Sequence, residues 1–176
     1  YFIDEKEIKE IVQKNNPTKK IGDVDIPKIE KLINNLPSID SSNVYLSLNG
    51  TLNVDIKQKV PVFRLTKNGN TFYVDEKGNE FPLTKTYSQP CMLVSGNVDK
   101  SEYVALGNLI KKIEADPFSK KYFIGISKEK GNYNLLPVEG NYKIEIGDLE
   151  RIDFKVKGFK AFMEKVLSYK NPDIYK

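Results

Sequence analysis

The sequence of 176 residues contains no histidine and a single cysteine, Cys91. The missing histidines exclude the commonest general base and the commonest zinc ligand, and one cysteine forms neither an internal disulfide nor a thiolate cluster. Calcium loops of the Asp-x-Asp-x-Asp-Gly type, Gly-x-Gly-x-x-Gly motifs and Gly-Lys-Ser phosphate loops are also missing from the sequence. We therefore predict no metal site, no cofactor and no catalytic residue, and we expect that the chain is not an enzyme.

Arginine is rare in this sequence. Only Arg64 and Arg151 are arginines among the 28 basic residues, and 24 acidic residues are spread among the lysines, which leaves a net charge of +4. Because nucleic-acid interfaces favour arginine for bidentate contacts to phosphates and bases, this composition argues against nucleic-acid binding. The lysines are better explained as solubilising surface charge.

Long apolar runs are missing as well. No stretch of 18 apolar residues occurs, so the sequence itself contains neither a membrane span nor a signal peptide. The first residue is tyrosine rather than methionine, and we expect that a preceding segment was removed or left out. The hydrophobic content of 39% is ordinary for a globular protein of one domain or two small ones.

Residues 43–56 alternate apolar and polar side chains on both sides of an Asn-Gly turn signal, which predicts a β-hairpin. A two-residue loop would place the two apolar sets on opposite faces of the hairpin. A core on one side therefore requires an odd loop, and we expect this loop at residues 49–51. The expected pairs are Leu48 with Leu52, Leu46 with Val54 and Val44 with Ile56.

Two helices are predicted before this hairpin. An acidic capping-box pattern predicts the first helix over residues 5–14. Asp25 can cap a second helix that has Pro27 in its first turn. Its apolar face is expected to consist of Ile29, Leu32, Ile33 and Leu36. Residues 1–60 are thus expected to follow the order strand end, helix, helix, strand, strand.

The second half of the sequence has a different pattern. Apolar residues at helical spacing predict a helix that begins at Ser101 and ends at Asp116-Pro117. Turn signals separate three predicted strands at residues 122–127, 133–136 and 142–146, which are expected to form an antiparallel meander. A last helix is predicted over residues 150–169. Its inner face is expected to consist of Phe159, Phe162, Met163, Val166 and Leu167.

Several segments of the sequence are informative through their order and spacing together. These are Ile29-Glu30 with Leu32 and Pro37, Gln-Lys-Val-Pro-Val-Phe-Arg at residues 58–64, Phe-Tyr-Val-Asp at residues 72–75 with Gly78 and Phe-Pro-Leu at residues 81–83, and Leu-Val-Ser-Gly at residues 93–96. The β-α-α-β-β order of residues 1–60 is the pattern of a POTRA domain. With these segments, the chain as a whole resembles the extracytoplasmic part of the bacterial cell-division family FtsQ, also called DivIB, and the resemblance covers nearly all of the sequence.

The resemblance implies an α+β fold of two domains. An N-terminal POTRA domain is expected at residues 1–63, followed at residues 64–176 by an antiparallel β domain with two packed helices. In the family a further strand follows the last helix, whereas this sequence stops at residues 171–176, where that strand should begin. We therefore expect the final strand to be missing.

The resemblance also implies a function. It predicts a divisome scaffold that links early and late cell-division proteins for septum formation and binds partners similar to FtsB and FtsL. The family is anchored in the inner membrane by a single helix and works in the periplasm, so we expect the same localisation here. It places partner binding at the C-terminal end of the β domain, which corresponds to Ile174, Tyr175 and Lys176. Strand edges suit this role because they bind extended segments through backbone hydrogen bonds.

Two alternatives compete with this interpretation. One is a POTRA-type module of an outer-membrane assembly or secretion protein, although the sequence contains no second POTRA pattern and no barrel strands. The other is an extracytoplasmic module that binds the cell wall. A pulldown with peptidoglycan, compared with one using coiled-coil partner peptides, distinguishes the cell-wall module from the scaffold.

Overall fold

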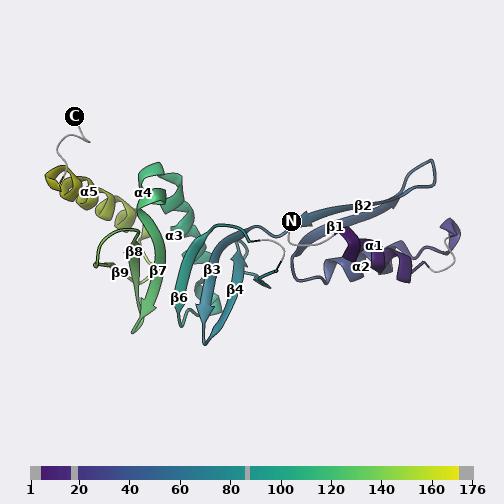
Figure 1. The fold of residues 1–176 in the computed structure, drawn as a ribbon, viewed down its shortest axis with the longest axis horizontal. Coiled ribbons are helices and arrows are strands. Elements are labelled where there is room, and N and C mark those ends of the chain that lie inside the picture. Colours follow the sequence, from purple (N-terminus) through teal and green to yellow (C-terminus); the bar gives the residue numbers. More distant parts are fainter. Residues whose placement is uncertain (1–4, 17–19, 86–87, 171–176) are drawn as a thin grey trace. The chain divides into compact units, whose positions relative to one another are not determined.

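The computed structural model describes residues 5–16, 20–85 and 88–170. The chain forms two compact units (Figure 1). Unit 1 comprises Tyr1–Val60 together with Phe81–Gln89, and unit 2 comprises Pro61–Glu80 together with Pro90–Lys176. Both units combine helices with β-strands, so the predicted α+β class is confirmed.

Unit 1 begins with two helices. They are α1 (Glu5–Lys14) and α2 (Ile26–Asn34), with a short 3-10 helix, η1 (Ile21–Asp23), before α2. The Asp25 carboxylate caps α2 by accepting a hydrogen bond from the Lys28 N–H at 3.2 Å. Both predicted helices are therefore confirmed. The strand end expected at the start of the chain lies outside the described residues.

The two strands of unit 1, β1 (Ile39–Leu46) and β2 (Leu52–Gln58), form the predicted antiparallel hairpin. Leu46 pairs with Leu52, and Val44 pairs with Val54. The expected pairs were therefore wrong by two residues along β2. Leu46 and Val54 nevertheless lie on the same face, as the parity argument requires.

The loop of this hairpin explains the difference. A hydrogen bond from the Ser47 N–H to the Thr51 carbonyl oxygen, at 2.9 Å, encloses a loop of residues 48–50. Its last residue, Gly50, has a φ of 83°, which a three-residue loop requires at this position. The loop is odd, as predicted, but it includes Leu48, whose side chain is fully exposed at the tip.

The core of unit 1 lies between the two helices and one face of the hairpin. Its buried residues are Ile8, Ile29, Ile33, Ile39 and Val44. Leu36 and Val54 pack against them. Leu32 is 37% exposed, so its predicted place on the inner face of α2 was wrong.

The second sheet has seven strands in the order β5-β4-β3-β6-β7-β8-β9. β6 is parallel to both of its neighbours, β3 and β7, whereas the hairpins β3–β4, β7–β8 and β8–β9 are antiparallel. The sheet is therefore mixed. The predicted antiparallel meander of the last three strands is confirmed, whereas the expectation of a wholly antiparallel domain was wrong because β6 pairs in parallel. Crossover connections before and after β6 allow this parallel pairing. The strands are β3 (Pro61–Lys67), β4 (Asn70–Asp75), β5 (Glu80–Pro82), β6 (Met92–Gly96), β7 (Phe123–Glu129), β8 (Asn132–Pro137) and β9 (Ile144–Gly147).

The first helix of unit 2, α3 (Tyr103–Ala115), follows a 3-10 turn, η2 (Lys100–Glu102). The predicted inner face of α3 is confirmed, because Tyr103, Leu106, Leu109, Ile110 and Ile113 are all buried. A second, short helix, α4 (Pro117–Tyr122), was not predicted. The Asp116 carboxylate caps α4 by accepting a hydrogen bond from the Ser119 N–H at 3.0 Å. This helix includes Tyr122, so β7 begins one residue later than predicted.

The last helix, α5 (Ile152–Lys170), packs on the same core through Phe159 and Met163, as predicted. Phe162 is 58% exposed, so its predicted place on the inner face was wrong. Val156 packs against the core instead. The side chains of Val166 and Leu167 lie outside the described part of the chain.

Candidate partner-binding site

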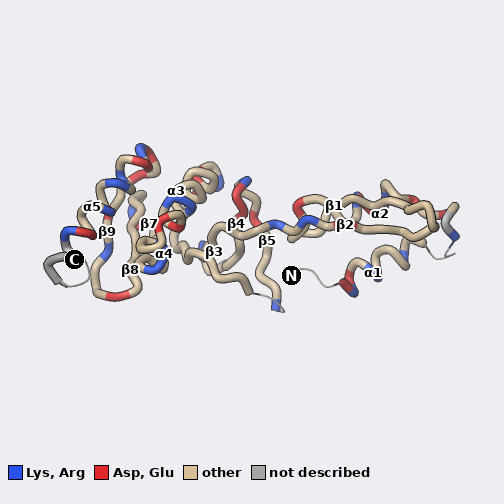
Figure 2. Tube along the Cα trace, turned by 90° about the horizontal axis from the view of Figure 1, so that it is seen from above, with Lys and Arg blue, Asp and Glu red and all other residues tan. Residues whose placement is uncertain are grey.

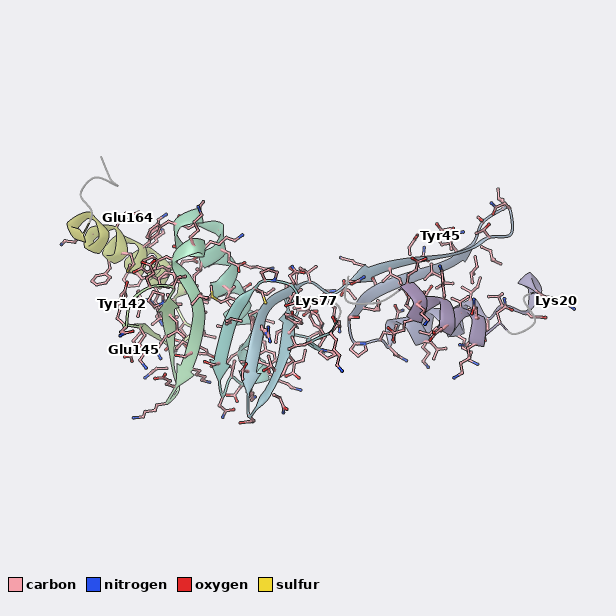
Figure 3. All side chains as sticks on the ribbon, viewed as in Figure 1. Lys20, Tyr45, Lys77, Tyr142, Glu145 and Glu164 are labelled. Carbon is pink, nitrogen blue, oxygen red and sulfur yellow. The ribbon has the colours of Figure 1, made fainter. Side chains whose placement is uncertain are left out.

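β9 and α5 form the candidate site of unit 2. β9 is the last strand of the sheet, and it pairs with β8 alone within the described part of the chain. Its second edge therefore presents backbone N–H and C=O groups that an incoming strand can use. Figure 3 shows the side chains of Glu145 on β9 and Glu164 on α5.

A groove with a volume of ≈ 300 Å³ lies between β9 and α5. Gly158 keeps part of it open, since a Cβ placed on this residue would meet no atom within 4 Å. The exposed ring of Phe162 lies at the groove. An apolar groove beside a strand edge can accept alternate side chains of an added strand. The lining residues are Ile144, Glu145, Ile146, Lys155, Gly158, Phe159 and Phe162.

Ion pairs connect α5 to the rest of unit 2. The Lys160 Nζ lies 3.0 Å from the Asp116 Oδ1, and Lys112 pairs with Asp153. The pKa of Asp116 is lowered, first by a hydrogen bond from the Ser119 hydroxyl and then by one from Lys160. Figure 2 shows basic and acidic residues interspersed along α5, whereas the charged residues of α3 lie at its C-terminal end. These ion pairs hold α5 against α3 and the start of α4.

The partner-binding residues predicted from the sequence, Ile174, Tyr175 and Lys176, lie outside the described residues, so their role stays a prediction. The groove adds Phe162, which sequence reasoning assigned to the core because it continues the apolar pattern of α5. The exposure of Phe162 could have been predicted from the number of apolar residues on α5, which is larger than one buried stripe needs. The apolar stripe of α5 covers the core, and the additional ring of Phe162 remains exposed.

The outer edge of β1 in unit 1 is different because polar side chains of α2 occupy it. The Glu30 carboxylate accepts a hydrogen bond from the Val44 N–H at 3.1 Å. On the same side, the Ser42 hydroxyl donates to the Asn34 Oδ1 at 2.7 Å. One outward backbone donor of β1 is thus already satisfied within the chain, which discourages addition of another strand at this point.

A second groove in unit 1 lies between α1 and β2, with a volume of ≈ 630 Å³. β2 pairs with β1 alone within the described part of the chain. Apolar side chains from both elements make up most of the lining. They are Ile8, Val12, Leu52, Val54 and Ile56.

One polar cluster lies near the core of unit 2. The Lys128 Nζ lies 2.6 Å from the Glu102 Oε2, and the Tyr133 hydroxyl donates to the same oxygen at 3.1 Å. Burial by itself would raise the pKa of Glu102, but the hydrogen bonds from Lys128, Tyr133 and the Asp99 N–H outweigh it and lower the pKa. The partners satisfy one another, which is typical of a structural cluster.

Other candidate chemistry is weak. Burial raises the pKa of the Cys91 thiol to about 11, so the thiol stays protonated and unreactive at neutral pH. Among the described residues, no group of His, Cys, Asp and Glu side chains could hold a metal ion. Within the same residues, no helix combines the length and the apolar character that a membrane span requires.

Comparisons with known proteins agree with this architecture. Residues 1–57 match a family described as a POTRA-like domain. Unit 1 therefore belongs to a class of small modules with two helices packed on strands.

Residues 60–176 match the family described as FtsQ/DivIB, C-terminal related, and the chain belongs to this family. Among solved structures, the chain is similar to the major extracytoplasmic domain of the cell-division protein DivIB from Geobacillus stearothermophilus, in its trans isomer. The identity is 12%, the TM-score is 0.44, and the match covers 60% of this chain and 91% of that chain. No curated protein sequence matches this chain. Membership of the FtsQ/DivIB family supports a role in cell division.

Proposed function

We propose that this chain is a non-catalytic scaffold of the bacterial divisome that links early and late division proteins during septum formation. Family membership supports the role in division, and the β9 edge with its apolar groove supports binding of other proteins. The partners are proteins similar to FtsB and FtsL, and Ile174, Tyr175 and Lys176 take part in the contact. The chain works on the periplasmic side of the inner membrane, with an anchoring helix outside the given sequence.

Strand addition at β9 is the proposed mode of binding. The incoming strand forms backbone hydrogen bonds with the edge of β9 that is unpaired among the described residues, and its alternate apolar side chains enter the groove between β9 and α5. The observation that carries this proposal is that, within residues 5–16, 20–85 and 88–170, β9 pairs on one side only and lies next to a groove with an exposed phenylalanine. This mode needs no acid, base or nucleophile.

A matched pair of α5 variants tests the proposal. Phe162 and Phe154 are 58% and 67% exposed, and only Phe162 lines the groove. We expect Phe162→Asp to weaken binding of an FtsB-like partner at least about tenfold by calorimetry, as loss of an interface aromatic does. Phe154→Asp should retain the affinity, and both variants should keep the melting temperature because neither ring is in the core.

A second variant, which ends at Lys170, tests the predicted contribution of residues 171–176. We expect it to bind the partner more weakly than the full chain while unit 2 remains folded. Equal affinity in the full chain, the shortened chain and Phe162→Asp would move the interface away from β9. Retention of the chain on peptidoglycan, with no binding to the coiled-coil partner, would instead favour the cell-wall module.

A further inference from the structure

The face of the seven-stranded sheet opposite its helices contains a groove that the proposed function does not use. On β3, Phe63 and Leu65 point into the core with α3, so Arg64 between them points to the other face. Its neighbour on the parallel strand β6 is Leu93, which is 47% exposed. This outer face is therefore only partly covered.

Gly125 on β7 is one of the residues that line this outer face. Gly125 lies between Leu93 on β6 and Leu136 on β8 in the sheet. A Cβ at this position would lie 3.0 Å from the Leu93 carbonyl oxygen and 3.4 Å from the Leu136 Cδ1. The glycine therefore allows Leu136 to pack closely over β7, and the adjacent Ile124 is 51% exposed. An apolar groove with a volume of ≈ 510 Å³ lies on this face, lined by residues of these strands.

Among the described residues that line this groove, Arg64 is the only charged one. The other lining residues are apolar or carry hydroxyl groups: Thr66, Thr71, Leu93, Val94, Ser95, Ile124, Gly125 and Leu136. Arg64 is partly buried, and no hydrogen bond or ion pair of its side chain occurs within the described part of the chain. A guanidinium has five N–H donors in a planar fork that matches a carboxylate. The groove therefore combines an unsatisfied cation with apolar surface.

We propose that this groove, named here the Arg64 groove, binds an acidic segment of a partner protein. A carboxylate of the segment forms a bidentate pair with Arg64, and the apolar side chains that flank it cover Leu93, Ile124 and Leu136. Charge complementarity selects this occupant, because a partly desolvated arginine without a partner favours a carboxylate over a neutral or basic group. The Arg64 groove is separate from the β9 edge, so this proposal goes beyond the proposed function.

The probe for the test is an acetylated and amidated pentapeptide, Ser-Leu-Glu-Leu-Ser, with Ser-Leu-Gln-Leu-Ser as its neutral counterpart. Each peptide is titrated into the ¹⁵N-labelled chain, and amide shifts are followed by NMR. We expect the acidic peptide to shift the amides of Leu93, Ser95, Ile124 and Gly125. The neutral peptide should bind about tenfold more weakly or worse, since a charge-assisted hydrogen bond is lost.

The chain offers a matched control because it contains only one other arginine. Arg64→Gln should remove the preference for the acidic peptide, whereas Arg151→Gln should leave it unchanged. Ile124→Ser should weaken binding of both peptides, since this exposed side chain contributes apolar contact and little to the core. Unchanged dispersion of the other amides shows that each variant is folded.

Three results of the peptide titrations would overturn the proposal. They are equal affinity of the wild-type chain for both peptides, unchanged preference in Arg64→Gln, and shifts confined to residues outside the groove. Shifts of the same amides on concentrating the protein alone would also overturn it, because the occupant would then be a second copy of this chain. Loss of partner binding in Phe162→Asp has no bearing on these outcomes.

Discussion

The β1 edge of unit 1 and the β9 edge of unit 2 both lack a neighbouring strand within the described part of the chain, but they treat their backbone groups differently. At β1, the Glu30 carboxylate of α2 accepts a hydrogen bond from the Val44 N–H. At β9, the adjacent helix contributes Phe159 and Phe162 to a groove beside the edge. An adjacent helix can therefore accept hydrogen bonds from the backbone N–H groups of a strand edge through a polar side chain. It can also contribute apolar surface beside the edge, against which an added strand can pack.

The two units also differ in the size of their cores. Among the described residues, the core of unit 1 has five buried members from two helices and β1, whereas the core of unit 2 includes residues from most strands of the seven-stranded sheet and from α3 and α5. A small core leaves a small margin of stability. Satisfying the Val44 N–H should therefore matter more for the stability of unit 1 than a single edge hydrogen bond does for unit 2.

The largest effect should come from the cores. Ile33 in unit 1 and Ile110 in unit 2 are both 0% exposed. Truncation of either one to alanine should remove about 2–5 kcal/mol. We expect Ile33→Ala to abolish protection of unit 1 amides from hydrogen exchange, because its core is small, and Ile110→Ala to leave unit 2 amides protected. Equal loss of protection in the two variants would contradict the expected difference in stability between unit 1 and unit 2.

An intermediate effect should follow loss of the carboxylate at the β1 edge. Glu30→Ala leaves the Val44 N–H without its acceptor, which should destabilise unit 1 by about 1–3 kcal/mol. Glu30→Gln keeps an acceptor oxygen and should have a smaller effect. Hydrogen exchange of the Val44 amide, together with urea unfolding, measures both. If the Val44 amide exchanges as slowly in Glu30→Ala as in the original chain, a group other than Glu30 protects this N–H at the β1 edge.

The smallest effect concerns acid and is expected in unit 2. Because the folded pKa of Glu102 is lowered, the folded state binds fewer protons than the unfolded state near that pKa. The resulting stabilisation is present above the unfolded pKa of about 4.3 and is lost as the pH falls through the folded pKa. We expect the melting temperature of unit 2 to decrease as the pH is lowered through that range, and to decrease less steeply in Glu102→Gln. The same slope in both proteins would assign the acid sensitivity to other carboxylates.

Local patterns in the sequence predicted the helices well. The carboxylate of Asp25 caps α2, and the apolar spacing of α3 matches its buried face, because helix signals depend on residues a few positions apart. The hairpin loop was predicted with the correct parity and the wrong position. Parity depends on which face is buried, whereas the loop position depends on where Gly50 can adopt a positive φ.

Features that depend on distant residues could not be predicted in the same way. The parallel pairing of β6 depends on how the chain returns to the sheet, and the apolar pattern of a strand is compatible with either direction. The exposure of Phe162 depends on how α5 is rotated over the sheet. Likewise, Glu30 was noted for the family resemblance, but its contact with Val44 joins two residues that are 14 positions apart and lie in different elements.

The central place of β6 in the seven-stranded sheet has a consequence for folding. β6 joins β3 to β7, so without it the sheet consists of two separate groups, β5-β4-β3 and β7-β8-β9. Both contacts of β6 are non-local, and loop closure makes such contacts slow to form. During synthesis, β3 and β4 emerge before β6, so one edge of β3 stays unpaired until β6 has been synthesised. We therefore expect the pairing of β6 (Met92–Gly96) with β3 and β7 to limit the rate at which unit 2 folds. The β3–β4 hairpin, before β6 has paired with it, should be the species most prone to aggregation.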